Sequence, residues 1–338
     1  MRLRIAGLFV FLAVRLWAGE PRIELAWPTP NTAYLEGKPI EAYVQTTASG
    51  EAESGLFGCI RSGGAQFHEG VDLKPVSRDR RGEPTDPIFA ALPGVVRYIN
   101  PVAGESNYGR YIVLEHPDMK PAVYTLYAHL SATVPGLKIG DTVTRGQVIA
   151  TMGHTADKGG IPKERAHLHF EIGLMVTRDF QRWYDWKKFG SLNPHGLYNG
   201  MNLMGVNPLD FFNEFRARRV DNFQEYFARL PAVATVCVAT HAVPDFVLRY
   251  PVLLTKEIPV AGVAGWAIKV TWTGLPVSWT PLSAGEMIGW RADEVRLSDV
   301  DAETIRKYRC KSVVVMRHGN YVTGKDLDTV LQQLFGLR

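Results

Sequence analysis

The sequence predicts a mainly β fold, with an all-β domain followed by a smaller α+β region. Between residues 56 and 174, short apolar runs with period-2 alternation are interrupted by Gly and Pro, and no segment has convincing helical periodicity. Residues 232–338 contain further strand-like runs and end in a short helical pattern of Leu and Val. A chain of 338 residues is long enough to form two such units.

In the all-β part, strands are expected where β-branched and aromatic residues cluster between turn signals. In chain order, we expect them within residues 88–99 (with a turn at 92–94), 111–115, 122–129, 142–143 and 147–150. Residues 20–55, rich in Pro, Thr, Gly and Glu, are expected to form an extended leader over this domain, with one edge strand at 23–28. In the second region, 236–273 and 312–316 read as strands.

The N-terminus has the pattern of a secretory signal peptide over residues 1–19. Arg2 and Arg4 precede an apolar run from Ile5 to Val14, and small residues follow at positions 18 and 19. The run is shorter than the ~20 apolar residues that span a bilayer, so no stable membrane span is expected after cleavage. We therefore expect export to the periplasm or the extracellular side of the cell envelope, with an uncleaved anchor as the alternative.

The charge balance gives no reason to expect a nucleic-acid partner. The whole chain has a formal charge of +4, but the predicted signal contributes three arginines and no acidic residue, which leaves the remainder at +1. Proteins that bind nucleic acid through the phosphate backbone usually present a basic surface. Nucleic acid is therefore not predicted as a ligand.

Three cysteines, Cys59, Cys237 and Cys310, lie far apart in the sequence. An odd number at such spacing is not a disulfide framework, and no Cys-x-x-Cys pair indicates a thiolate zinc site. One bridge is possible in an oxidising compartment, and Cys237 with Cys310 would be the pair within one domain. The alternative is three buried free thiols.

Between the two regions, residues 178–205 read as a long loop with at most one helical turn. Loops of this length are usually functional or disordered, and the aromatic residues Trp183, Tyr184 and Trp186 argue against disorder. A helix is expected to open at Asn207-Pro208 and, over residues 213–231, to link the first domain to an accessory domain of unknown role at 232–338.

Histidine and aspartate occur in three short stretches of the all-β region. His68 and Asp72 are four residues apart, with Gly70 between them allowing the chain to bend. In His167-Leu168-His169 both imidazoles share one face, because residues i and i+2 of a strand point the same way. His129 ends a predicted strand. By contrast, His116 and His154 are expected in loops or at the surface.

Each stretch alone is also common in structural roles, but their conjunction in one domain of an exported chain favours a metal site. Two His and one carboxylate are a usual ligand set for catalytic zinc, which leaves a fourth position to water. The remaining histidines could move the proton or stabilise the developing oxyanion. The residues thus predict a zinc hydrolase, without deciding which of His167 and His169 binds the metal.

Taken together, these stretches resemble peptidase family M23, the lysostaphin-like or LytM-type zinc peptidases of peptidoglycan. The resemblance covers about residues 56–212. It depends on the segments 68–72, 127–130 and 167–172, on 107–113, 137–143 and 146–149, and on Asn207-Pro208.

The resemblance implies an antiparallel β-sheet peptidase domain with a β-hammerhead-like part. His68, Asp72 and His169 would bind Zn²⁺, while His129 and His167 would act as base and transition-state stabiliser. The substrates would be peptide cross-links or stems of peptidoglycan, hydrolysed by a zinc-activated water. Some family members carry a tyrosine shortly before the first ligand, which contacts the developing oxyanion. This chain has none there, so the oxyanion contact is absent or comes from Tyr108.

Three other functions compete with this interpretation. A zinc peptidase could act on a protein outside the cell wall, and a non-catalytic wall-binding or regulatory module could share the fold. The regulatory module predicts the loss of one or more of the five residues, and all five are present. The third is a biotinyl- or lipoyl-type carrier, suggested by residues 140–149, but this stretch lacks the modifiable lysine that a carrier needs.

Overall fold

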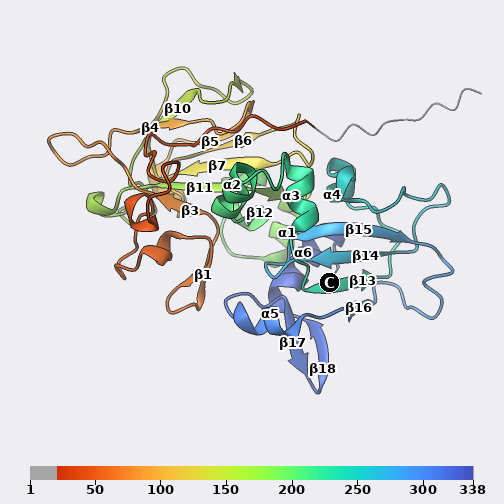
Figure 1. Cartoon of the computed structure of the whole chain (residues 1–338). Helices are drawn as coiled ribbons and strands as arrows, with labels where there is room; N and C mark the ends of the chain where they lie inside the picture. The colour runs from red at the N-terminus through yellow and green to blue at the C-terminus, as the bar shows by residue number, and fades with distance from the viewer. Residues whose placement is uncertain (1–20, 338) are drawn as a thin grey trace, which may run out of the picture.

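The centre of the molecule is a seven-stranded antiparallel sheet. The structure, a computed structural model, describes residues 21–337 (Figure 1). Neighbouring strands of this sheet are, in order, β12 (Leu203–Val206), β11 (Leu168–Met175), β7 (Tyr124–Ala128), β6 (Tyr111–Glu115), β5 (Gly94–Asn100) and β9 (Thr142–Val143), with β3 (Val71–Leu73) also paired to β11. The mainly β, antiparallel fold predicted from the sequence is confirmed.

Two smaller antiparallel sheets accompany it. One contains β4 (Pro87–Phe89), β10 (Val148–Met152) and β8 (Leu130–Thr133), and the other is the hairpin of β1 (Gly58–Arg61) and β2 (Gln66–His68). Strands β6, β7 and β11 are buried over nearly their whole length, as their runs of apolar residues predict.

The leader crosses the domain without forming the expected edge strand at 23–28. Three backbone bonds tie that stretch to the rest of the chain, from Ile23 N to Asp221 O, from Ala26 N to Ala91 O and from Phe89 N to Pro28 O. Proline has no N–H, so a strand ladder cannot continue through Pro28. Trp27 instead stacks on Tyr34, with ring centroids 4.4 Å apart, in the main apolar core. Two 3₁₀ turns, Ile40–Ala42 and Ala52–Gly55, complete the leader.

The predicted linking helix over 213–231 is two helices, α2 (Pro208–Arg216) and α3 (Phe223–Arg229). The single helix was wrong because Arg218 adopts φ +55°, which no α-helix can contain, and because Asn222 starts a new helix by accepting from the Glu225 N–H. The predicted loop 178–205 also holds a helix, α1 (Phe180–Lys187), and two 3₁₀ turns, Gly196–Tyr198 and Gly200–Asn202.

Residues 232–337 have the predicted α+β composition. Their four-stranded sheet has the order β15 (Pro276–Leu282), β14 (Gly265–Val270), β13 (Ala234–Val238) and β16 (Val295–Ser298), and β17 (Val314–Arg317) pairs with β18 (Asn320–Thr323). The helices are α4 (Asp245–Arg249), α5 (Ala302–Lys307) and α6 (Lys325–Phe335). One continuous apolar cluster joins this region to the seven-stranded sheet, and α2 and α3 lie between them (Figure 1). Whether 56–212 and 232–338 are separate domains stays a prediction.

The predicted signal peptide lies outside the described residues. Within residues 21–337, no helix has the length and apolar character needed to cross a bilayer.

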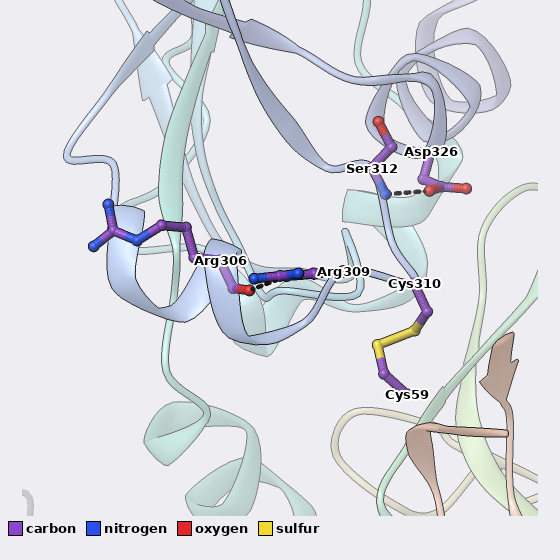
Figure 2. Close-up of a disulfide and its surroundings, with 6 residues drawn as sticks. All are labelled: Cys59, Arg306, Arg309, Cys310, Ser312 and Asp326. Atoms are coloured by element: carbon purple, nitrogen blue, oxygen red, sulfur yellow. Dashed lines mark hydrogen bonds between the residues drawn. A yellow bond between two sulfur atoms is a disulfide. The ribbon is translucent and has the colours of Figure 1, made fainter. Parts of the chain in front are cut away.

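A disulfide joins the two regions. It links Cys59 in β1 to Cys310 after α5, with Cα atoms 5.5 Å apart (Figure 2). The predicted Cys237–Cys310 pair is therefore wrong, and so is the alternative of three free thiols. Cys237 lies in β13, between β14 and β16, whereas Cys310 lies against β1; Cys237 is free and partly buried.

We predict that Cys310→Ser lowers the free energy of unfolding by about 2–4 kcal/mol, because the bridge restricts the unfolded chain. Urea titration of the oxidised proteins measures the change. Cys237→Ser is the matched control and should unfold at the wild-type urea concentration. Equal midpoints for all three proteins would contradict a stabilising bridge.

His116, expected in a loop or at the surface, is fully buried. Its Nδ1 lies 2.8 Å from the carbonyl oxygen of Pro93 and its Nε2 2.8 Å from Oγ1 of Thr125. Burial lowers the pKa of His116 from 6.5 to about 4, although the Pro93 carbonyl acts in the opposite direction. The folded chain therefore keeps this imidazole neutral at pH values where the unfolded chain protonates it.

We predict that His116 contributes an acid-sensitive part of the stability. Because the pKa is lower in the folded state, the unfolded chain binds more protons below pH 6.5, and stability falls with pH until about pH 4. The wild type should lose about 3 kcal/mol more than His116→Gln across this window. Unfolding in urea at both ends of the window measures the difference. Equal losses of unfolding free energy in wild type and His116→Gln would show that His116 does not titrate this way.

Candidate metal centre

Three strands bring the predicted ligands together. His68 ends β2, Asp72 lies in β3, and His169 lies in β11, where it is the register partner of Asp72. The turn between β2 and β3 passes close to β11. A Cβ at Gly70 would lie 2.4 Å from the carbonyl oxygen of Phe170, so only glycine fits there.

The three candidate ligand atoms form a nearly equilateral triangle. His68 Nε2 lies 3.0 Å from His169 Nδ1 and 3.1 Å from Asp72 Oδ1, and the latter two atoms are 3.0 Å apart. Ligands about 2.0–2.2 Å from one tetrahedral zinc lie roughly 3.3–3.5 Å from each other, so a small outward movement would admit the ion. All three side chains are buried. The group could therefore hold a metal.

His129 and His167 lie beside this triangle. His167 Nε2 is 3.4 Å from Asp72 Oδ1, and the rings of His129 and His167 are 4.7 Å apart at an angle of 70°. His129 has φ +61°, a left-handed conformation that is uncommon for a residue other than glycine. Its backbone N–H donates to the Tyr108 carbonyl, which helps to hold that conformation. The structure thus gathers all five predicted residues in one place.

Each imidazole has one nitrogen fixed by an acceptor outside the triangle. Nδ1 lies close to a carbonyl oxygen in three of them: Leu56 at 2.6 Å for His68, Thr155 at 2.8 Å for His129 and Arg165 at 2.7 Å for His167. A carbonyl can only accept, so Nδ1 carries the proton and Nε2 presents its lone pair to the site.

In His169 the roles of the two nitrogens are reversed. Its Nε2 lies 3.0 Å from Glu171 Oε1, which leaves Nδ1 for the ligand triangle. Glu171 is 1% exposed and also accepts hydrogen bonds from the hydroxyls of Tyr108 and Tyr124, at 2.7 and 2.8 Å. A carboxylate in this position orients a metal-binding histidine and raises its basicity.

Arg61 is the one residue at the site whose role the sequence did not indicate. Its Nη2 donates to Asp72 Oδ2 at 2.6 Å, so the two carboxylate oxygens divide between Arg61 and the histidines. The contact depends on the β1–β2 hairpin, which turns the chain back on itself. No local pattern around Arg61 carries that information.

The pKa values of the site residues fit a site at which protons and a metal cation compete for the same ligand atoms. Burial would raise the pKa of Asp72, but the neighbouring imidazoles of His167 and His68 and the hydrogen bond from His169 hold it well below its usual range. Burial would lower the pKa of His169, but Asp72 and Glu171 raise it to about 10. A proton therefore occupies His169 where a metal would bind, and the metal must displace it.

His129 and His167 have the opposite tendency. Burial lowers the pKa of both, and for His129 the neighbouring His167 and His169 lower it well below the usual range. Both rings are therefore neutral near pH 7 and can accept a proton, although Asp72 partly offsets the shift in His167.

A cleft of about 290 Å³ opens over the five residues and is also lined by Tyr108, Ile161 and Arg165. The segment just before His167 thus forms part of its wall. The tyrosine contact that the family resemblance left open is not available from Tyr108 here, because its hydroxyl donates to Glu171.

The comparison with known protein families finds one match. Residues 66–179, about a third of the chain, match the model of Peptidase family M23. This part of the chain belongs to that family of peptidases. No curated protein sequence matches the chain.

Several solved structures are similar to part of it. The catalytic domain of the prophage-encoded M23 protein EnpA from Enterococcus faecalis is 23% identical, with 39% of this chain and 80% of that one covered and a TM-score of 0.28. The catalytic domain of the antimicrobial peptidase lysostaphin from Staphylococcus simulans is 20% identical, with 52% of this chain and 95% of that one covered and a TM-score of 0.29. A zinc-containing peptidase from Vibrio cholerae is 26% identical, with 45% of this chain and 37% of that one covered and a TM-score of 0.30. Scores of this size are too low to support a conclusion about this chain.

We predict that Glu171→Gln lowers the affinity for zinc by about 10–100-fold, because the amide is a weaker acceptor for the His169 Nε2–H. Competition with a chromogenic chelator measures the affinity. Glu115→Gln is the matched control, since Glu115 lies on the same sheet and is paired with Arg97 rather than with the site. Unchanged zinc affinity in the Glu171 variant would mean that this carboxylate does not support the metal.

Proposed function

We propose that the chain is a zinc-dependent endopeptidase that hydrolyses peptide cross-links or stems of bacterial peptidoglycan. The observation that carries the proposal is the buried His68–Asp72–His169 triangle with the rings of His129 and His167 beside it. Membership of residues 66–179 in peptidase family M23 supports the reaction class, and the resemblance of the motifs to peptidases of the bacterial wall supports the substrate.

His68, Asp72 and His169 would hold the metal through Nε2, Oδ1 and Nδ1. Two imidazoles and one carboxylate suit zinc, and three protein ligands leave a coordination position open. When bound, zinc would polarise the scissile carbonyl and make a water acidic enough to attack it near neutral pH. Arg61 would keep Asp72 ionised and oriented through Oδ2.

His129 and His167 would handle the protons. Their Nε2 atoms present lone pairs to the cleft, so one ring can accept a proton from the attacking water. Once protonated, that ring can donate to the leaving amine, and the other can stabilise negative charge on the carbonyl oxygen. Their closeness makes it unfavourable for both to be charged, which favours this division of roles.

The proposed substrate also sets where the chain must act. Peptidoglycan lies outside the cytoplasmic membrane, so the proposal includes export directed by residues 1–19. A peptidase that acts on a protein outside the wall is the second candidate, because the metal site alone does not choose the substrate.

We predict that residues 20–338 with added zinc release uncross-linked stem peptides from purified sacculi, read by mass spectrometry. A chelator and His169→Ala should abolish release, because the metal is lost. His129→Ala and His167→Ala should keep zinc but lower kcat by about 10²–10⁴-fold, the usual contribution of a general acid or base. His241→Ala, which removes an exposed histidine of the other region, is the control and should behave as wild type.

Two outcomes would contradict the proposal in different ways. Equal release by wild type and His169→Ala would exclude zinc catalysis at this site. No release by any form that retains zinc would exclude peptidoglycan hydrolysis and favour the non-wall substrate or a binding role.

A further inference from the structure

A second cavity adjoins the metal cleft. It has a volume of about 700 Å³ and shares Glu69, Asn107 and Tyr108 with the cleft, so the two spaces meet at these residues. Its far walls come from parts of the chain outside the family match. They include Trp183 and Phe189 from the 178–205 segment and Lys311, Asp326 and Val330 from the C-terminal region.

Two lysines line this cavity: Lys187, which is exposed, and Lys311, which is partly buried and has no acidic partner among the described residues. The Lys311 Nζ lies 4.2 Å from the centroid of the Phe67 ring. Although Glu69, Glu105 and Asp326 line the same cavity, no salt bridge to Lys311 exists among residues 21–337. Lys311 is partly buried, so an anion that enters the cavity would gain a charge-assisted hydrogen bond to an ammonium with no competing acidic partner.

The backbone holds Lys311 in place from both sides. The preceding residue, Cys310, is bonded to Cys59 in β1, and the following residue, Ser312, donates its N–H to the Asp326 carboxylate (Figure 2). The Asp326 N–H in turn donates to the Ser312 carbonyl at 3.0 Å. The backbone at Lys311 therefore loses little conformational freedom when the side chain binds a ligand, which favours affinity.

Glu69 and Lys311 favour different groups of a bound peptide. Glu69 lies at the junction with the metal cleft and makes no salt bridge or hydrogen bond through its side chain within the described residues. Its negative charge disfavours a carboxylate at the junction, whereas the Lys311 ammonium favours one beside Phe67. A peptide with a free carboxylate away from the scissile bond therefore suits the cavity.

We propose that the larger cavity extends the substrate groove and that Lys311 binds a free carboxylate of the peptide substrate. Lys311 would then be a specificity-determining residue supplied by the C-terminal region. This inference rests on the proposed peptidase function. It also gives the disulfide a second role, since the bond fixes Lys311 against the hairpin that carries Arg61 and His68.

The test compares two substrates and three variants of residues 20–338. The substrates are cross-linked muropeptides from sacculi and the same muropeptides with their carboxylates converted to methylamides. For the unmodified substrate, Lys311→Gln should raise KM by about 10–100-fold, as expected for loss of a hydrogen bond between charged groups, and leave kcat within about twofold. Lys311→Arg keeps the charge and should restore most of the affinity. Lys307→Gln, an exposed lysine that does not line the cavity, should match wild type.

The modified substrate tests the idea without relying on any variant. Wild type should show the same rise in KM on the methylamide substrate, and Lys311→Gln should add no further rise. Equal KM values of wild type for the two substrates would overturn the role of Lys311 while leaving the peptidase function intact. No hydrolysis of either substrate by zinc-loaded wild type would overturn the proposed function and this inference together. Zinc content and thermal midpoint distinguish a binding defect in Lys311→Gln from a folding defect. The comparison of the two substrates with wild type does not depend on the folding of any variant.

Discussion

The site depends on the pairing of β3 with β11, which sets Asp72 opposite His169. Asp72 is 2% exposed, and a carboxylate so deeply buried is stable only when its charge is compensated. Arg61 satisfies one oxygen, and the imidazoles surround the other. The same pairing therefore creates the charge, compensates it and places three ligand atoms about 3 Å apart. A shift of one residue in this register would turn Asp72 away from His169, because side chains alternate across a strand.

The parts of this arrangement that follow a local sequence pattern could be predicted from the sequence. Strand periodicity placed His167 and His169 on one face, and the conjunction of His129 with the His68–Asp72 stretch indicated a metal site in an all-β domain. The deeply buried Glu171 could be assigned only as a group flanking a ligand, because its contacts with Tyr108 and Tyr124 join different strands. Arg61 and the Cys59–Cys310 bond could not be predicted, since both depend on how distant segments meet.

Helix α1 and the break between α2 and α3 were not predicted for a different reason, because their sequence patterns are local and were overlooked. In α1, Phe180, Trp183 and Tyr184 have the i, i+3, i+4 spacing of a helix face, and all three are buried. The break between α2 and α3 carried the pattern Asn222-x-x-Glu225, a helix start in which Asn222 accepts from the Glu225 N–H. One of these elements, α1, forms part of the wall of the larger cavity.

The β1–β2 hairpin connects these observations. Strands of three or four residues, such as β1, β2 and β3, have little stability by themselves. Here the hairpin is held from outside, by the disulfide from the C-terminal region, by packing of Phe67 against Trp272 and by the Lys311 ammonium over Phe67. Since the hairpin carries both Arg61 and His68, the C-terminal region positions one candidate metal ligand and the partner of another. In this chain, residues outside the family match therefore help to build the candidate metal site as well as the cavity beside it.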